Sequence, residues 1–260
     1  MNELTSTHTR MTVRCLLLAA VFLMTSGVEL PARDMATVPG RTITVRIPVD
    51  ADATLIETTD GRLANGSGSS IFVGRTQQPS DSRRRSLLRF DVASEIPRRA
   101  IIEDATLILN VLPGTAPAID VRVFRVLRPW TEGPAISSGG NGALAMPGDV
   151  TWIHRSYDIA TWRRPGGVFV RRASAAQTIA GPGLYEWRKT VRRPRAASLQ
   201  DDVQFWLSVP ERNFGWILIG GEGQPRTAKK ITSREGSDAD ARPMLEIRYR
   251  MPLPGLQRPL

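Results

Sequence analysis

Arginine clusters are the residues of this sequence with the clearest chemical potential. Arg83, Arg84 and Arg85 follow one another behind a polar segment, and Arg163 and Arg164 form a second group. A guanidinium can hold a carboxylate or a phosphate through two parallel hydrogen bonds. The 260-residue chain also has 35 lysines and arginines against 25 aspartates and glutamates, a formal net charge of +10. These five arginines predict an anion-binding surface, and the alternative is a solvated positive patch.

Trp206 is the tryptophan that the sequence pattern places best for a ligand. Apolar and polar residues alternate from position 203 to 209, which predicts a strand with one buried face. Trp206 falls on the polar face of that alternation, together with Gln204 and Ser208. An exposed indole there could stack on a sugar ring, although a loop or a neighbouring strand could also cover it. An exposed Trp206 would favour sugar binding, and a buried one would favour a structural role.

Carboxylates stand near both ends of the expected domain. Asp50 and Asp52 come at its start, and Asp238 and Asp240 come just before its last strand. The ends of a domain commonly lie close together, and calcium takes roughly six to eight oxygen ligands. The four aspartates therefore predict a calcium site, and the alternative is that they are turn residues and strand caps.

Few residues of the chain suit catalysis. The only histidines are His8 and His154, and the only cysteine is Cys15. This composition excludes a zinc site built from cysteine and histidine, a Cys-x-x-Cys redox pair and an internal disulfide framework. No catalytic constellation is recognisable, so we expect a protein that is not an enzyme. A polysaccharide lyase that uses His154 or Tyr157 with arginines, or a hydrolase that uses two carboxylates, stays open as an alternative.

The first 36 residues have the pattern of an export signal. Arg10 and Arg14 precede a short apolar run at residues 15–24, and small residues follow it. The run is shorter than the roughly 20 residues of a permanent membrane span. The pattern allows a start at Met1 or Met11 and cleavage near residue 27 or residue 36. We therefore expect a secreted, periplasmic or cell-surface protein without a transmembrane span in its mature form.

The rest of the chain has the pattern of β-strands separated by turns. Clear alternation occurs at residues 43–49, 105–111, 203–209 and 245–249, and Gly, Pro, Asn and Ser cluster between the apolar runs. The pattern predicts an all-β fold, a two-sheet antiparallel β-sandwich of jelly-roll type. We place a linker and first strand at residues 37–49, the sandwich domain at 50–250 and a Pro-rich tail at 251–260.

Seven short motifs occur in an order that is typical of a known domain family. They are Asp52-Ala53-Thr54-Leu55, Leu87-Leu88-Arg89-Phe90-Asp91, Asp104-Ala105-Thr106-Leu107, Trp130-Thr131-Glu132-Gly133, Thr151-Trp152, Asn213-Phe214-Gly215-Trp216 and Ser233-Arg234-Glu235. In this order the chain resembles the DNRLRE domains, which are related to disaggregatase repeats and to carbohydrate-binding module family 96. The resemblance covers roughly residues 50–250 and departs from the family at residues 171–202, which do not align. It implies a secreted β-sandwich that accompanies polysaccharide-active enzymes, with binding of alginate-type polymers in some members.

These observations together predict a secreted, non-catalytic carbohydrate-binding module. Its expected ligand is an anionic extracellular polysaccharide, such as a polyuronate, held by Arg83, Arg84, Arg85, Arg163 and Arg164 with Trp206 stacking on a sugar ring. The alternative from another class is a structural protein of the cell envelope or matrix. Contact with anionic envelope components would also suit the positive charge. The basic charge would also suit nucleic acid, but export removes most of the reason to expect that partner.

Overall fold

The computed structural model describes residues 40–188 and 197–253 of the chain. The predicted export signal at residues 1–36 lies outside the described residues, as does most of the predicted tail at 251–260. Within the described ranges, no helix has both the length and the apolar character that a membrane crossing requires.

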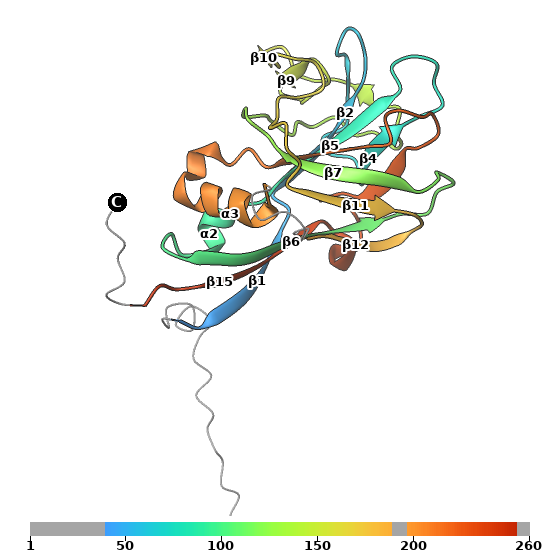
Figure 1. The fold of residues 1–260 in the computed structure, drawn as a ribbon. Helices are drawn as coiled ribbons and strands as arrows, with labels where there is room; N and C mark the ends of the chain where they lie inside the picture. The colour runs from blue at the N-terminus through green and yellow to red at the C-terminus, as the bar shows by residue number, and fades with distance from the viewer. Residues whose placement is uncertain (1–39, 189–196, 254–260) are drawn as a thin grey trace, which may run out of the picture.

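Antiparallel strands form most of the regular structure and confirm the predicted all-β sandwich (Figure 1). Its jelly-roll connectivity stays a prediction. The main sheet is 11-stranded and consists of β1 (Thr42–Pro48), β2 (Ala51–Ile56), β4 (Ser70–Arg75), β5 (Arg83–Arg89), β6 (Ile101–Val111), β7 (Ile119–Arg125), β11 (Ala175–Ile179), β12 (Gly183–Trp187), β13 (Trp216–Gly220), β14 (Lys229–Thr232) and β15 (Met244–Arg250).

The strand order shows how one sheet supplies both layers of the sandwich. Along the hydrogen bonds the order is β1-β15-β6-β14-β4-β5-β13-β7-β11, with β12 also beside β6 and β2 also beside β5. Strand β4 joins the two layers, because its first residues pair with β14 and its last two pair with β5. Strand β1 pairs with β15 along its whole length, so residues 42–48 of the segment expected as linker and first strand belong to the sheet.

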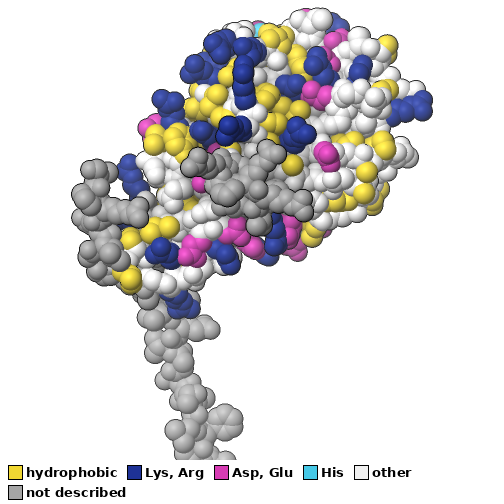
Figure 2. Space-filling view, viewed as in Figure 1, with side chains coloured by type: hydrophobic (Ala, Val, Ile, Leu, Met, Phe, Trp, Pro, Cys, Tyr) yellow, Lys and Arg dark blue, Asp and Glu magenta, His cyan; other side chains and the backbone are white. Residues whose placement is uncertain are grey.

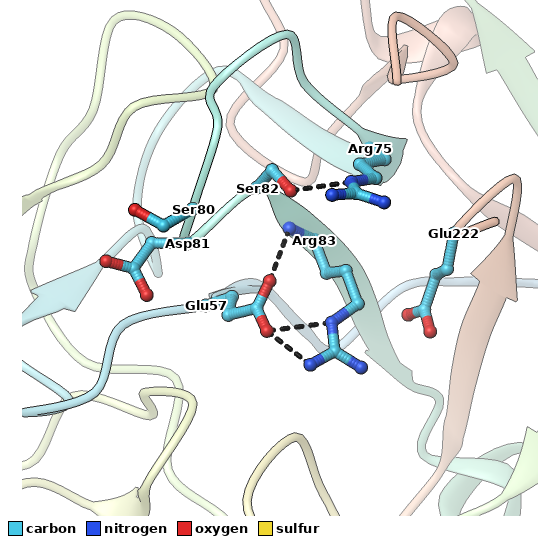
Figure 3. Close-up of a pocket in the computed structure, with 7 residues that line it drawn as sticks. All are labelled: Glu57, Arg75, Ser80, Asp81, Ser82, Arg83 and Glu222. Carbon is cyan, nitrogen blue, oxygen red and sulfur yellow. Dashed lines mark hydrogen bonds and ion pairs between the residues drawn. The ribbon is translucent and has the colours of Figure 1, made fainter. Parts of the chain in front are cut away.

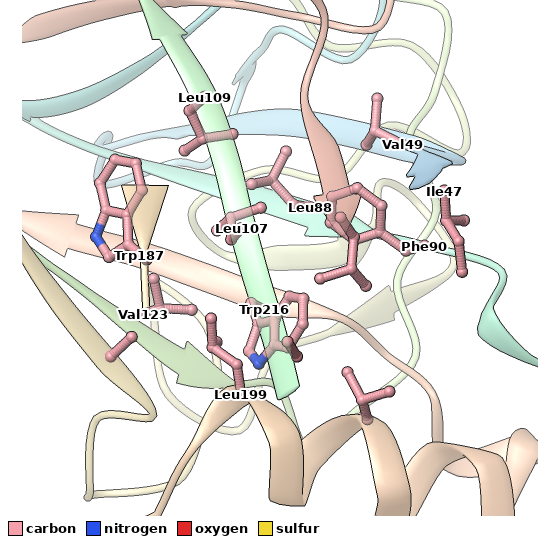
Figure 4. Close-up of a cluster of buried hydrophobic side chains, with 14 of the residues drawn as sticks. Ile47, Val49, Leu88, Phe90, Leu107, Leu109, Val123, Trp187, Leu199 and Trp216 are labelled. Atoms are coloured by element: carbon pink, nitrogen blue, oxygen red, sulfur yellow. The ribbon is translucent and has the colours of Figure 1, made fainter. Parts of the chain in front are cut away.

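The main core lies between the two layers (Figure 4). It joins Ile47 of β1 and Leu107 of β6 on one side to Leu88 of β5 and Trp216 of β13 on the other. All four side chains are at most 2% exposed. Because these residues come from strands far apart in the chain, burial of their apolar surface fixes the pairing of the layers.

A second apolar cluster lies on the outer face of strands β2, β5 and β13. Successive residues of a strand point to opposite faces of the sheet. Leu88 therefore lies in the main core, whereas its neighbour Leu87 lies in this second cluster. Trp130, Trp152 and Trp162 cover this face from the long connection that follows β7. That connection carries the short strands β8 (Ala143–Leu144), β9 (His154–Ser156) and β10 (Ala160–Thr161), and β8 pairs with β3 (Leu63–Ala64). The central strands are therefore buried on both faces.

The strand predicted at residues 203–209 is wrong. Residues Leu199–Ser208 form helix α3, which lies beside the short helix α2 (Val92–Glu95) at one end of the sandwich (Figure 1). The Ser198 side chain caps the helix by accepting a hydrogen bond of 3.1 Å from the Asp201 amide. Helix-spaced apolar residues then face the core: Leu199, Val203, Trp206 and Leu207.

The region at residues 171–202, which does not align with the family motifs, still contains regular structure. Just before it, Phe169 forms only an isolated bridge with Val126. The region itself contains two regular strands, β11 and β12. Strand β11 extends the layer of β13 and β7 by pairing with β7 from Ala175 to Ile179.

Candidate functional site

An open groove of about 440 Å³ lies where strands β2, β4, β5 and β13 begin or end (Figure 3). We call it the arginine groove. The loop that joins β4 to β5 forms one wall, and Arg75 at the end of β4 donates a hydrogen bond of 2.8 Å to Ser82 Oγ. The residues that line the groove are Glu57, Arg75, Ser80, Asp81, Ser82, Arg83 and Glu222.

Arg83 occupies the centre of the groove but already holds a carboxylate. Its Nε and its backbone amide donate to the two oxygens of Glu57 at 2.8 and 2.9 Å. Burial alone would raise the pKa of Glu57, but these bonds from Arg83 outweigh burial and hold the pKa below its usual value. The same hydrogen bond raises the pKa of Arg83 above its usual value. Arg83 is therefore a paired guanidinium, although its side chain is still 42% exposed.

Arg85 connects the groove to the loop at residues 162–167. Its Nε donates to Glu222 at 2.6 Å, and its Nη1 donates to the Gly166 carbonyl at 2.7 Å. The guanidinium carbons of Arg85 and Arg83 also lie 4.7 and 5.3 Å from the ring centroid of Trp152. Cations on the face of a buried indole are attracted by the ring electrons. These contacts fix both guanidiniums, and Arg85 links the loop to Glu222, which lines the groove.

Arg84 is not available to a ligand, which corrects its assignment as a binding residue. Its side chain is buried at 1% exposure, because strand alternation turns it away from Arg83 and Arg85. It donates to the Asp81 and Gly140 carbonyls and to Gln78 Oε1. Burial lowers its pKa to about 10. Arg84 therefore organises the β4–β5 loop rather than binding an external anion.

Arg163 and Arg164 are the two predicted binding residues that the structure leaves exposed. They follow β10 in the loop that Arg85 holds through Gly166. Neither has a hydrogen bond, ion pair or ring contact to another described residue. Figure 2 shows that Lys and Arg side chains gather at the end of the molecule that carries β9 and β10. This end is the most basic part of the face in view.

Trp206 does not form a sugar-stacking platform, and the expectation of an exposed indole is wrong. The side chain has 0% exposure and packs against Trp216 in a tilted arrangement, with ring centroids 4.5 Å apart. Trp216 in turn donates to buried Asp202 at 2.9 Å, and Asp202 pairs with Arg125. All six tryptophans lie within the described residues and all are buried.

The four aspartates predicted to bind calcium do not meet in one place. Asp50 pairs with Arg89 on the surface, and Asp238 accepts from the Asp240 amide to cap a short helical turn, η2 (Ala239–Ala241). Asp52 is instead buried beside two glutamates that sequence reasoning did not select, Glu132 and Glu235. Both glutamates stand in family-like motifs, but their meeting depends on the fold.

His154 and Tyr157, which were considered for a lyase, lie against each other. Their ring centroids are 5.0 Å apart in an edge-to-face arrangement. His154 Nδ1 is 3.1 Å from the hydroxyl of Thr151, whose Oγ1 also accepts from two backbone amides. These contacts orient the His154 ring within the turn. They do not supply a further catalytic group for the lyase alternative.

Comparisons with known proteins leave the family open. No protein-family model matches the chain, and no curated protein matches it. The resemblance to DNRLRE domains is therefore a proposal.

The pair of Glu57 with Arg83 predicts an acid-sensitive contribution to stability. Because the pKa of Glu57 is lowered on folding, this contribution is present above the unfolded pKa, near 4.5, and is lost as the pH falls through the folded value. Unfolding by urea between pH 7 and pH 3 should show a smaller loss of stability for Glu57→Gln than for the wild type. The exposed Glu211→Gln variant serves as the control and should follow the wild type. Parallel curves for all three proteins would contradict the pairing.

Proposed function

We propose that this chain is a binding module for an anionic extracellular polysaccharide, and that it acts without chemical turnover. The observation that supports this most is the pair Arg163 and Arg164. Both are exposed and free of partners among the described residues, and Arg85 links their loop to Glu222 of the arginine groove. The net charge of +10 favours the approach of a polyanion to this face.

The proposed mechanism is ionic pairing and hydrogen bonding rather than ring stacking. Glu57 and Glu222 already neutralise Arg83 and Arg85, so the groove itself offers little net positive charge. A uronate carboxylate would pair with Arg163 and Arg164 in bidentate fashion. The groove, with Ser80, Ser82 and Arg75 in its lining, would hold sugar hydroxyls. Affinity should fall with salt, because exposed charges are screened over about 8 Å at physiological ionic strength.

The proposal includes export, for which the sequence pattern at residues 1–36 is the support. The proposal also rests on the resemblance to DNRLRE domains. Some members of that family bind alginate-type polymers, which is why we expect a ligand of this kind. A secreted module of this kind would attach to polysaccharide outside the cell.

A binding screen tests the proposal. The purified chain is passed over immobilised alginate, a neutral glucan and dextran sulfate at low and high salt in calcium-free buffer. We expect saturable retention on alginate that exceeds retention on dextran sulfate. Equal weak retention on both polyanions, abolished by modest salt, would contradict a specific site and reduce the arginines to nonspecific charge.

A structural role in the envelope or matrix is the second candidate, and two observations favour it. Trp206 is buried, which is the outcome expected of a scaffold. In addition, the apolar side chains of Leu144, Met146 and Ile159 are 72%, 51% and 75% exposed. Exposed apolar side chains suit contact with another protein. Concentration-dependent association in sedimentation velocity, lost on replacing Leu144 and Ile159 with serine, would support this candidate.

A further inference from the structure

Three carboxylates from distant parts of the chain, one buried and two partly buried, meet beside the start of strand β2. Asp52 lies in β2, Glu132 follows Trp130 in the long connection, and Glu235 lies in the turn after β14. One oxygen of each lies within 4.8 Å of the others. Asp52 has 0% exposure, whereas the side chains of Glu132 and Glu235 are 17% and 24% exposed, so the group reaches from the interior towards the surface.

The charges of this group do not balance among the described residues. Arg234 is the one cation that acts on Asp52 and Glu132, and its guanidinium bridges Glu132 at 2.7 Å and Glu235 at 2.6 Å. In a metal site all three carboxylates would be ionised. Together with the single guanidinium of Arg234 they would carry two negative charges, which one divalent cation would neutralise.

Two oxygens of the group are buried and have no hydrogen-bond partner. Asp52 Oδ2 accepts from the Arg234 amide at 2.6 Å, but Asp52 Oδ1 accepts from nothing in the described chain. Glu235 Oε1 pairs with Arg234, whereas Glu235 Oε2 is likewise without a partner there. A buried carboxylate oxygen that accepts nothing is costly, so such an oxygen indicates a missing ligand.

We propose that Asp52, Glu132 and Glu235 form a calcium site. Carboxylate oxygens are the ligands that calcium prefers, and oxygens on opposite sides of a calcium ion are about 4.6–5.2 Å apart at metal–oxygen distances of about 2.3–2.6 Å. Asp52 Oδ1 and Glu235 Oε2 are the free ligands, and Glu132 completes the set. The ion would tie β2, the long connection and the turn after β14 together. This site is separate from Arg163 and Arg164, so it does not depend on the proposed polysaccharide binding.

Calcium titration of the purified chain tests the proposal. Isothermal titration calorimetry with CaCl2 should show one ion per chain, with a dissociation constant of about 1 mM or tighter. Calcium should also raise the melting temperature, and EDTA should reverse the rise. A folded wild-type chain that shows neither saturable binding nor a melting shift with millimolar CaCl2 would overturn the site. A buried water would then be the partner of the two oxygens.

Substitutions of single carboxylates test which residues bind the calcium ion. Asp52→Asn should abolish binding, and Glu235→Gln should weaken it by at least about tenfold, because each removes a free ligand oxygen. Asp50→Asn is the matched control, since Asp50 lies two residues away and pairs with Arg89 at the surface. Its affinity should stay within about twofold of the wild type. If Asp52→Asn does not fold, the calcium affinity of Glu235→Gln is the deciding measurement. An affinity of Glu235→Gln equal to that of the wild type would refute the proposed site.

Discussion

Trp206→Ala is expected to lower the free energy of unfolding by about 3–5 kcal/mol. The indole is fully buried, contacts Trp216 at a centroid distance of 4.5 Å and belongs to the main core between the layers. Its removal leaves a cavity next to Trp216, which positions Asp202 and Arg125. Chemical denaturation monitored by tryptophan fluorescence measures the change.

The Trp206→Phe variant separates packing from any role at the surface. It keeps a ring against Trp216 and removes an indole N–H that has no partner in the described chain. We expect a clearly smaller loss of stability than for alanine. Both variants, under conditions where they are folded, should bind polysaccharide like the wild type. A folded Trp206→Ala chain with normal stability and lost binding would show that the indole faces a ligand after all.

Arg84→Met is expected to destabilise the fold by about 3 kcal/mol or more. Methionine fills much of the same space but cannot donate hydrogen bonds. The carbonyl oxygens of Gly140 and Asp81 would lose the donor that buried Arg84 supplies, and Gln78 Oε1 would keep only the hydroxyl of Thr76. The β4–β5 loop, which forms a wall of the arginine groove, would then lose its anchor. Urea denaturation and limited proteolysis of the loop measure the two effects.

Arg163→Met is the matched control for Arg84→Met. The same substitution at this exposed arginine removes no contact with a described residue. Its stability should stay within about 0.5 kcal/mol of the wild type. Equal losses for the two variants would contradict the structural role of Arg84.

The misassigned helix shows why periodicity alone could not decide the structure of residues 199–208. Val203, Phe205 and Leu207 satisfy a period of two, but Leu199, Val203 and Leu207 also satisfy a helical spacing. The sequence did contain a deciding signal, since Ser198 and Asp201 have the spacing of a helix N-terminus. The same kind of alternation predicted strands β1, β6 and β15 correctly, and β1 is also rich in the β-branched residues that favour strands.

The burial of Arg84 was partly predictable as well. In a strand, Arg84 shares a face with Ser86 and Leu88, and the alternation places Leu88 in the core. By contrast, no local pattern could show that Glu57 and Glu222 neutralise Arg83 and Arg85, because these partners come from other strands. Asp52 was predicted as a calcium ligand with three other aspartates, but the carboxylates beside it are Glu132 and Glu235. Its partners depend on how three distant segments pack.

Polysaccharide binding through the exposed arginine pair is tested most directly with two charge-matched double variants. Arg163→Ser/Arg164→Ser removes the proposed site. Arg98→Ser/Arg99→Ser removes the same charge from another exposed pair without described partners, after α2, far from β9 and β10 in Figure 1.

Affinity for alginate oligosaccharides is measured by calorimetry in calcium-free buffer for the wild type and both variants. We predict at least about tenfold weaker binding for the Arg163/Arg164 variant, because two guanidinium–carboxylate contacts are lost. The Arg98/Arg99 variant should bind within about twofold of the wild type. Equal weakening of both variants would contradict a site at this loop and attribute the binding to net charge.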